Sequence, residues 1–122
     1  MYRTVTRLLG LAGRRRPVEG TVVQTPAEVS VVDHTATRRR TSEGTHLAVT
    51  VHVRNDGDDP QPPLPVRVQF FQSRWLGRRE ASMAPVERAT GTLAPGATTT
   101  VEVGWRDADA VARYELAVGR GP

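Results

Sequence analysis

The sequence predicts an all-β fold, a sandwich of about seven antiparallel strands, and three observations support this prediction. Several segments alternate apolar with polar residues, which is the period of two of a half-buried strand. Segments rich in Gly, Pro, Asn and Asp separate them at intervals of roughly 8 to 12 residues. No helical period lies between them. The same features are compatible with a barrel, but they favour a sandwich.

The clearest strands lie in the middle of the chain. Residues 47–54 alternate Leu or Val with small or polar residues, so one face of this strand is expected in the core. The tripeptide Asn-Asp-Gly at 55–57 tolerates positive φ, and the prolines that follow cannot donate ladder hydrogen bonds, which predicts a loop. A second strand is expected over 66–71. Phe71 is apolar on its otherwise polar face, which indicates a bulge or a contact site.

The remaining strands are placed by turn signals. Pro95 and Gly96 predict a turn before a strand that ends at Trp105. The other expected strands cover residues 18–24, 28–32 and 112–118, with a short pair near 75–76 and 85–88.

Four motifs in this pattern also occur in a known class of domain. They are VHVRNDG at 51–57, VRVQFF at 66–71, TLAPG at 92–96 and VEVGW at 101–105. Together they resemble the immunoglobulin-like CARDB and FxLYD domains of bacteria and archaea, over about half of the chain. The resemblance implies an immunoglobulin-like sandwich of seven strands that serves as an extracytoplasmic or accessory interaction module. It implies no catalytic residues.

The length of 122 residues predicts one domain. We expect a basic amphipathic arm over 1–17, the sandwich over 18–119 and a polar tail over 120–122. The apolar run 8–13 is shorter than a transmembrane helix of about 20 residues or a signal-peptide core of about 7 to 15. A cytoplasmic location is therefore expected, although the family resemblance leaves an extracytoplasmic one open.

The positive charge is concentrated near the N-terminus. All 17 basic residues are arginine, and the absence of Lys and Ile indicates a G/C-rich genome, so the number of arginines is discounted. Their location is more informative. Residues 1–40 hold eight arginines against three acidic residues, a net charge of +5, whereas residues 41–122 hold nine against ten, a net charge of −1. This asymmetry predicts an acidic or polyanionic partner for the N-terminal third.

Two arginine-rich segments are the candidate partner sites. A helix over 2–14 would place apolar side chains on one face and arginines on another, which suits a membrane surface or the groove of a partner. Such a short helix can equally fray or pack on its own sandwich. The arginines at 38–40 are expected on a long loop, where with Trp75 they could bind single-stranded nucleic acid. The candidate residues are Tyr2, Arg3, Val5, Arg7, Leu8, Leu9, Arg14, Arg15, Arg16, Arg38, Arg39, Arg40 and Trp75.

The sequence does not predict an enzyme. No serine lies in a nucleophile motif, and the chain has no cysteine. His46 and His52 share a strand face but lie about 20 Å apart, which is too far for one metal ion. We therefore expect no cofactor, no metal and no small-molecule substrate. The expected function is protein–protein interaction, including self-association through a sheet edge, with nucleic-acid or anionic-membrane binding as the alternative.

Overall fold

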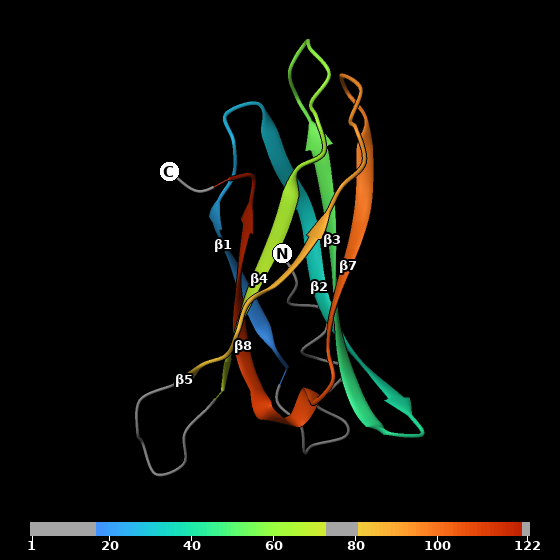
Figure 1. Ribbon diagram of the computed structural model, residues 1–122, viewed down its shortest axis with the longest axis vertical. Coiled ribbons are helices and arrows are strands. Elements are labelled where there is room, and N and C mark those ends of the chain that lie inside the picture. The colour runs from blue at the N-terminus through green and yellow to red at the C-terminus, as the bar shows by residue number, and fades with distance from the viewer. Residues whose placement is uncertain (1–16, 73–80, 121–122) are drawn as a thin grey trace.

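The computed structural model describes residues 17–72 and 81–120, and it confirms the all-β sandwich (Figure 1). Two sheets pack face to face, one of three strands and one of five. The elements are β1 (Glu19–Gln24), β2 (Val29–Thr41), β3 (Gly44–Asn55), β4 (Pro65–Gln72), β5 (Ala81–Ser82), β6 (Val86–Ala89), β7 (Thr98–Trp105), the short 3-10 helix η2 (Ala108–Ala110) and β8 (Val111–Val118). The predicted arm over 1–17 lies almost entirely outside the described residues.

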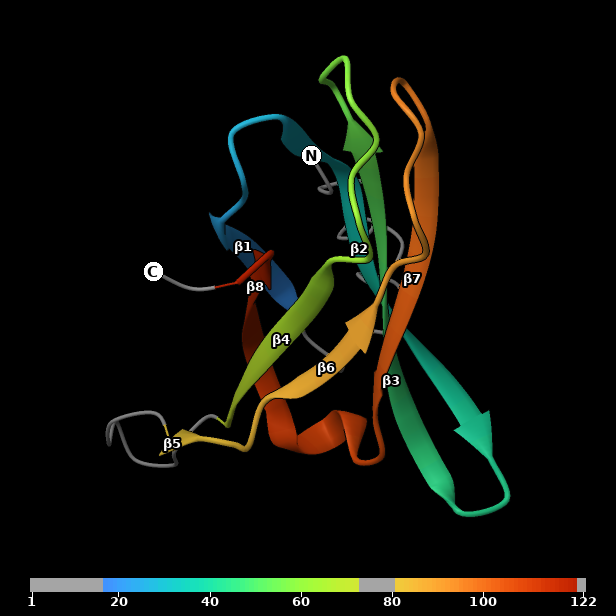
Figure 2. The same ribbon diagram turned by 45° about the horizontal axis from the view of Figure 1, so that its top comes forward.

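The three-stranded sheet has the order β2-β3-β7 and is antiparallel throughout. β7 ends at Trp105, which pairs with Leu47 of β3. Residues 44–46 of β3 therefore pair with β2 alone, and the β2–β3 hairpin extends past the end of β7, as Figure 2 shows. This projecting end carries Arg39 and Arg40, and Arg38 lies level with Trp105.

The five-stranded sheet is centred on β4 and β8. β4 pairs antiparallel with β8, β5 and β6, whereas β1 pairs with β8 in parallel, with Glu19 opposite Arg113. This parallel pair differs from the expected all-antiparallel arrangement. The reason is that β1 leads into β2 of the other sheet, so no hairpin constrains the direction in which it joins β8.

Alternating residues of both sheets form the core. The largest fully buried apolar side chains are Tyr114, Phe70, Leu47, Leu116, Val49, Val51, Val53, Val66, Val68, Val103 and Val118. The ring of Tyr114 packs directly on the backbone of Gly20, where a Cβ atom would overlap it. No residue of β1 belongs to the buried core cluster, so β1 covers the core with backbone instead of side chains.

The two turn motifs noted in the sequence contact each other. Asn55 is fully buried, and its Nδ2 donates to the carbonyl oxygens of Asp59 and Leu93 at 2.8 and 3.0 Å. Its Oδ1 accepts from the backbone N–H of Gly57 at 2.9 Å. The backbone N–H of Gly96, a residue with φ of 77°, donates to the carbonyl oxygen of Asn55. Asn55 therefore holds the loop after β3 against the turn before β7.

The bulge expected at Phe71 is present, since the β4–β8 register shifts between Phe71 and Gln72. The guanidinium of Arg113 lies 4.0 Å from the centre of the Phe71 ring. This cation–π contact explains why an apolar side chain is tolerated on the outer face of the sheet.

Candidate functional site

The longest strand of the described structure, β2, lies at the edge of its sheet. This strand has 13 residues, pairs with β3 along its length and is the outermost strand of its sheet. In the part of the chain that the structure describes, no strand pairs with its other side. A register shift between Val31 and Asp33 marks a bulge, and beyond it the pairing runs regularly from Asp33 to Thr41.

The side chains of this regular stretch divide between two faces. Those facing outward are polar, namely Asp33, Thr35, Thr37 and Arg39, which lie opposite His52, Thr50, Ala48 and His46 of β3. Those facing the other sheet are His34, Ala36 and Arg38, which lie opposite the core residues Val51, Val49 and Leu47. The edge thus presents a polar outer face.

The prediction that residues 38–40 lie on a loop is wrong, because they continue β2. Only Ser42 and Glu43 separate the paired residues Thr41 and Gly44, and Gly44 supplies the positive φ of 124° that this tight turn uses. As part of a strand, the three arginines alternate between the two faces and do not form one basic patch. The outward-facing Nη1 of Arg39 instead forms an ion pair with Oε2 of Glu102 at 2.9 Å.

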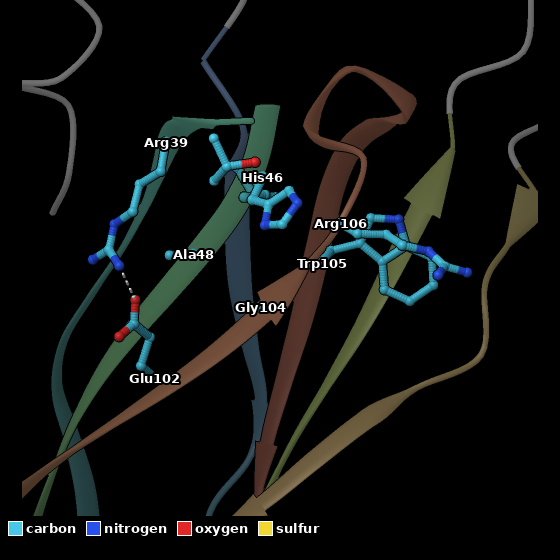
Figure 3. A pocket seen from close by; sticks show the side chains of 9 residues that line it. Arg39, His46, Ala48, Glu102, Gly104, Trp105 and Arg106 are labelled. Atoms are coloured by element: carbon cyan, nitrogen blue, oxygen red, sulfur yellow. Dashed lines mark ion pairs between the residues drawn. The ribbon is translucent and has the colours of Figure 1, made fainter. Parts of the chain in front are cut away.

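A pocket of about 390 Å³ lies beside this ion pair on the hairpin end of the sheet (Figure 3). Ala48 and Gly104 are directly opposite each other in the β3–β7 register, and their small size leaves space above the sheet. Figure 3 shows Arg39 and Glu102 on one side of this space and Trp105 with Arg106 on another. The lining residues are Arg39, Thr41, His46, Leu47, Ala48, Glu102, Gly104, Trp105 and Arg106.

The chemistry of this pocket suits an anionic group. Arg39 and Arg106 bring two positive charges to it, and Glu102 is the one carboxylate among its lining residues. Because Glu102 is already paired with Arg39, Arg106 gives the lining a net positive charge. The exposed fractions of the Arg39 and Glu102 side chains are 58% and 45%, so the pair is well solvated.

A second polar cluster faces the interior from β2. Nδ1 of His34 lies 2.6 Å from the hydroxyl oxygen of Tyr114, and the two rings meet edge to face. Burial lowers the pKa of His34 from its ordinary value of 6.5, and the charge of Asp33 partly opposes this shift. The neutral imidazole is therefore favoured at this position. The contact between His34 and Tyr114 links the edge strand β2 to the core strand β8.

The other candidate partner residues predicted from the sequence lie outside the described residues. They are Tyr2, Arg3, Val5, Arg7, Leu8, Leu9, Arg14, Arg15, Arg16 and Trp75. Sequence reasoning did not select His46 as a partner residue, nor Glu102, Gly104 and Arg106. No local signal marks the last three, because only the pairing of β7 with β3 brings this part of the chain to the pocket that Arg39 also lines.

Within residues 17–72 and 81–120, no group of three or more His, Cys, Asp and Glu side chains is placed to hold a metal ion. The same residues include no helix long and apolar enough to cross a membrane. No protein-family model matches the chain, and no curated protein or solved structure is significantly similar to it. The resemblance to CARDB and FxLYD domains therefore stays an expectation from the motifs.

Proposed function

We propose that this protein is a non-enzymatic interaction module that binds another polypeptide at the projecting end of the β2–β3 hairpin. The observation that carries this proposal is that β2 is a 13-residue edge strand whose last residues extend past the end of β7. Residues 39–44 at this end are exposed. An exposed strand end can pair with an added segment of polypeptide.

The charged groups beside this edge favour recognition over chemistry. Arg39 and Glu102 form an exposed ion pair beside the edge. Exposed charges of both signs on one surface suit the recognition of a charged segment of another polypeptide.

Proline substitutions at two adjacent positions at the end of β2 test the proposal. Successive amides of a strand point to opposite sides, so one of Arg40→Pro and Thr41→Pro removes an outward N–H and the other removes a bond to β3. We expect the variant that lacks the outward N–H to melt near the wild-type temperature and the variant that lacks the bond to β3 to melt well below it. Arg40→Ala is the control for the loss of the arginine charge. Partners cross-linked to the wild-type protein in the source lysate should be lost with the well-folded variant. Their retention by that variant would refute binding at this edge.

The alternative is nucleic-acid or anionic-membrane binding through the arginines. The alternation of residues 38–40 between two faces and the ion pair of Arg39 give it less support. It predicts an affinity for single-stranded DNA, RNA or anionic vesicles that falls steeply as salt is raised, because bound counterions are released. Affinity that is undetectable at low salt would exclude it.

A further inference from the structure

We propose that the pocket beside the β2–β3 hairpin binds the carboxylate of an aspartate or glutamate side chain of the bound polypeptide, with Arg106 as its principal partner. This inference rests on the proposed binding of a polypeptide at the end of the hairpin, and it adds the chemical class of the bound segment. Arg39 and Thr41 belong both to the hairpin end and to the lining of the pocket. A segment bound at that end therefore lies beside the pocket.

The pocket is a gap in the outer face of the three-stranded sheet. Ala48 and Gly104 lie opposite each other in the register, and Figure 3 shows Gly104 between the two charged sides. Among the described residues, a Cβ atom on Gly104 would meet only the carbonyl oxygen of Leu47, at 3.6 Å. The volume of about 390 Å³ is within the range of about 300 to 1,000 Å³ typical of ligand pockets. A side chain of another polypeptide can therefore enter it.

Two of the lining side chains are available to a ligand. Arg106 directly follows β7 and is exposed. In the part of the chain that the structure describes, neither its guanidinium nor the ring of His46 forms a hydrogen bond or an ion pair. A guanidinium can donate two parallel N–H bonds to one carboxylate. Arg106 can therefore bind a carboxylate without giving up a contact within the described structure.

The charge of the lining favours a carboxylate over a phosphate group. Apart from His46, the lining holds two arginines and one glutamate, which gives a net charge of +1. A carboxylate carries one negative charge and balances it. A phosphate group carries about −1.5 to −2 at pH 7 and would place the extra negative charge close to Glu102. Glu102 therefore disfavours the more highly charged ligand.

The apolar wall of the pocket favours a side chain over a free inorganic anion. Trp105 is half-buried, and its ring packs on that of the core residue Phe70 with centroids 5.3 Å apart. This contact holds the indole in place. The methylene groups of an acidic side chain can lie against the indole while the carboxylate reaches Arg106, the next residue in the sequence.

Peptide titration of the full chain, labelled with nitrogen-15, tests the ligand class. The probe is an acetylated and amidated peptide, Thr-Thr-Glu-Thr-Thr, and the matched control has Gln in place of Glu. We expect only the Glu peptide to shift the amide resonances of Gly104 and Arg106. Inorganic phosphate and the Gln peptide with a free C-terminus test the other anions, and both should bind more weakly than the Glu peptide.

Charge variants test the roles of the lining residues. Arg106→Gln should weaken binding of the Glu peptide by about fivefold, because it removes the principal donor. Arg120→Gln removes the same charge outside the lining and should bind like the wild type. Glu102→Gln should strengthen binding by about threefold, because it removes a repulsive charge and releases Arg39. Glu87→Gln is its matched control outside the lining.

Filling the pocket tests its location without disturbing the fold. A Cβ atom at position 104 would make only an ordinary contact, and valine is favoured in strands. Gly104→Val should therefore melt at or above the wild-type temperature. It should also lose measurable binding of the Glu peptide, because its side chain occupies the space above the sheet.

Several results would overturn the proposal. They are equal binding of the Glu and Gln peptides, an effect of Arg106→Gln no larger than that of Arg120→Gln, and a well-folded Gly104→Val variant that still binds. Binding of phosphate or of the free C-terminus as tight as that of the Glu peptide would also overturn it, because another anion would then fit the pocket equally well.

The proposed function can survive the failure of this inference. If Arg106→Gln and Gly104→Val retain a cross-linked partner that the well-folded proline variant loses, the acidic ligand is wrong and the hairpin end still binds a polypeptide. If the proline variant also retains that partner, the proposed function fails as well.

Discussion

The side-chain amide of Asn55 donates a hydrogen bond to the carbonyl oxygen of Leu93, although 38 residues separate them in the chain. This contact joins the loop that leaves β3 to the turn that enters β7. Residues 55–57 and 93–96 are also the turns of the motifs that resemble CARDB and FxLYD domains. In this molecule one buried side-chain amide, that of Asn55, therefore joins the turn after β3 to the turn before β7.

Asn55→Ala should destabilise the fold by about 2 to 4 kcal/mol, because it leaves the buried carbonyl of Leu93 and neighbouring groups without their donor. Urea denaturation followed by circular dichroism measures this difference. Asp59→Ala is the matched control. It keeps the backbone carbonyl that Asn55 contacts, so its effect should be under about 0.5 kcal/mol. Equal losses for the two variants would contradict the role given to the amide.

Gly20→Ala should lower stability by about 1 to 3 kcal/mol, because its Cβ would overlap the ring of Tyr114. That ring is buried and contacts His34, so it has little room to move. Gly91→Ala is the control, since its Cβ would meet nothing within 4 Å. The melting temperature of Gly20→Ala should be clearly lower than that of Gly91→Ala. A Gly20→Ala variant that melts at the wild-type temperature would show that β1 can shift without loss of stability.

His34 predicts a pH dependence of stability. Its pKa is lowered in the folded state, so the unfolded chain binds more protons in the range between the folded value and about 6.5. Stability should therefore be highest above about pH 7 and should decrease as the pH falls through 6.5 toward the folded value. Denaturation midpoints between pH 7.5 and 5.5 test this.

The controls for that measurement lie on the same hairpin. His34→Gln should remove part of the decrease. His52→Gln should keep it, because His52 faces outward and contacts the exposed Thr100. A decrease that persists unchanged in His34→Gln would assign it to other groups.

The ion pair of Arg39 with Glu102 should contribute little to the stability of the monomer. Both side chains are about half exposed, at 58% and 45%, and exposed pairs are typically worth about 0.2 to 1 kcal/mol. A double-mutant cycle with Arg39→Gln and Glu102→Gln should give a coupling at the low end of this range that shrinks further in high salt. A coupling well above about 1 kcal/mol would indicate a rigid, desolvated pair.

The strands with one apolar face were predictable from the sequence, because 47–54, 66–71 and 98–105 face the core at every second residue. The extension of β2 through residue 41 was not. Its inner positions His34 and Arg38 are polar, so no apolar period marks the strand, and its pairing with β3 stabilises it instead. The pocket could not be predicted from the sequence either, because Gly104 and Glu102 reach the neighbourhood of Arg39 only through the long-range pairing of β7 with β3.

The parallel contact of β1 with β8 has a consequence for synthesis of the protein. Glu19 leaves the ribosome well before its partner Arg113, because β1 and β8 are far apart in the sequence. β1 must therefore wait until β8 has been synthesised before it can pair. Until then β1 has no strand to pair with and no Tyr114 ring to pack on. We therefore expect β1 to join the sheet late in folding.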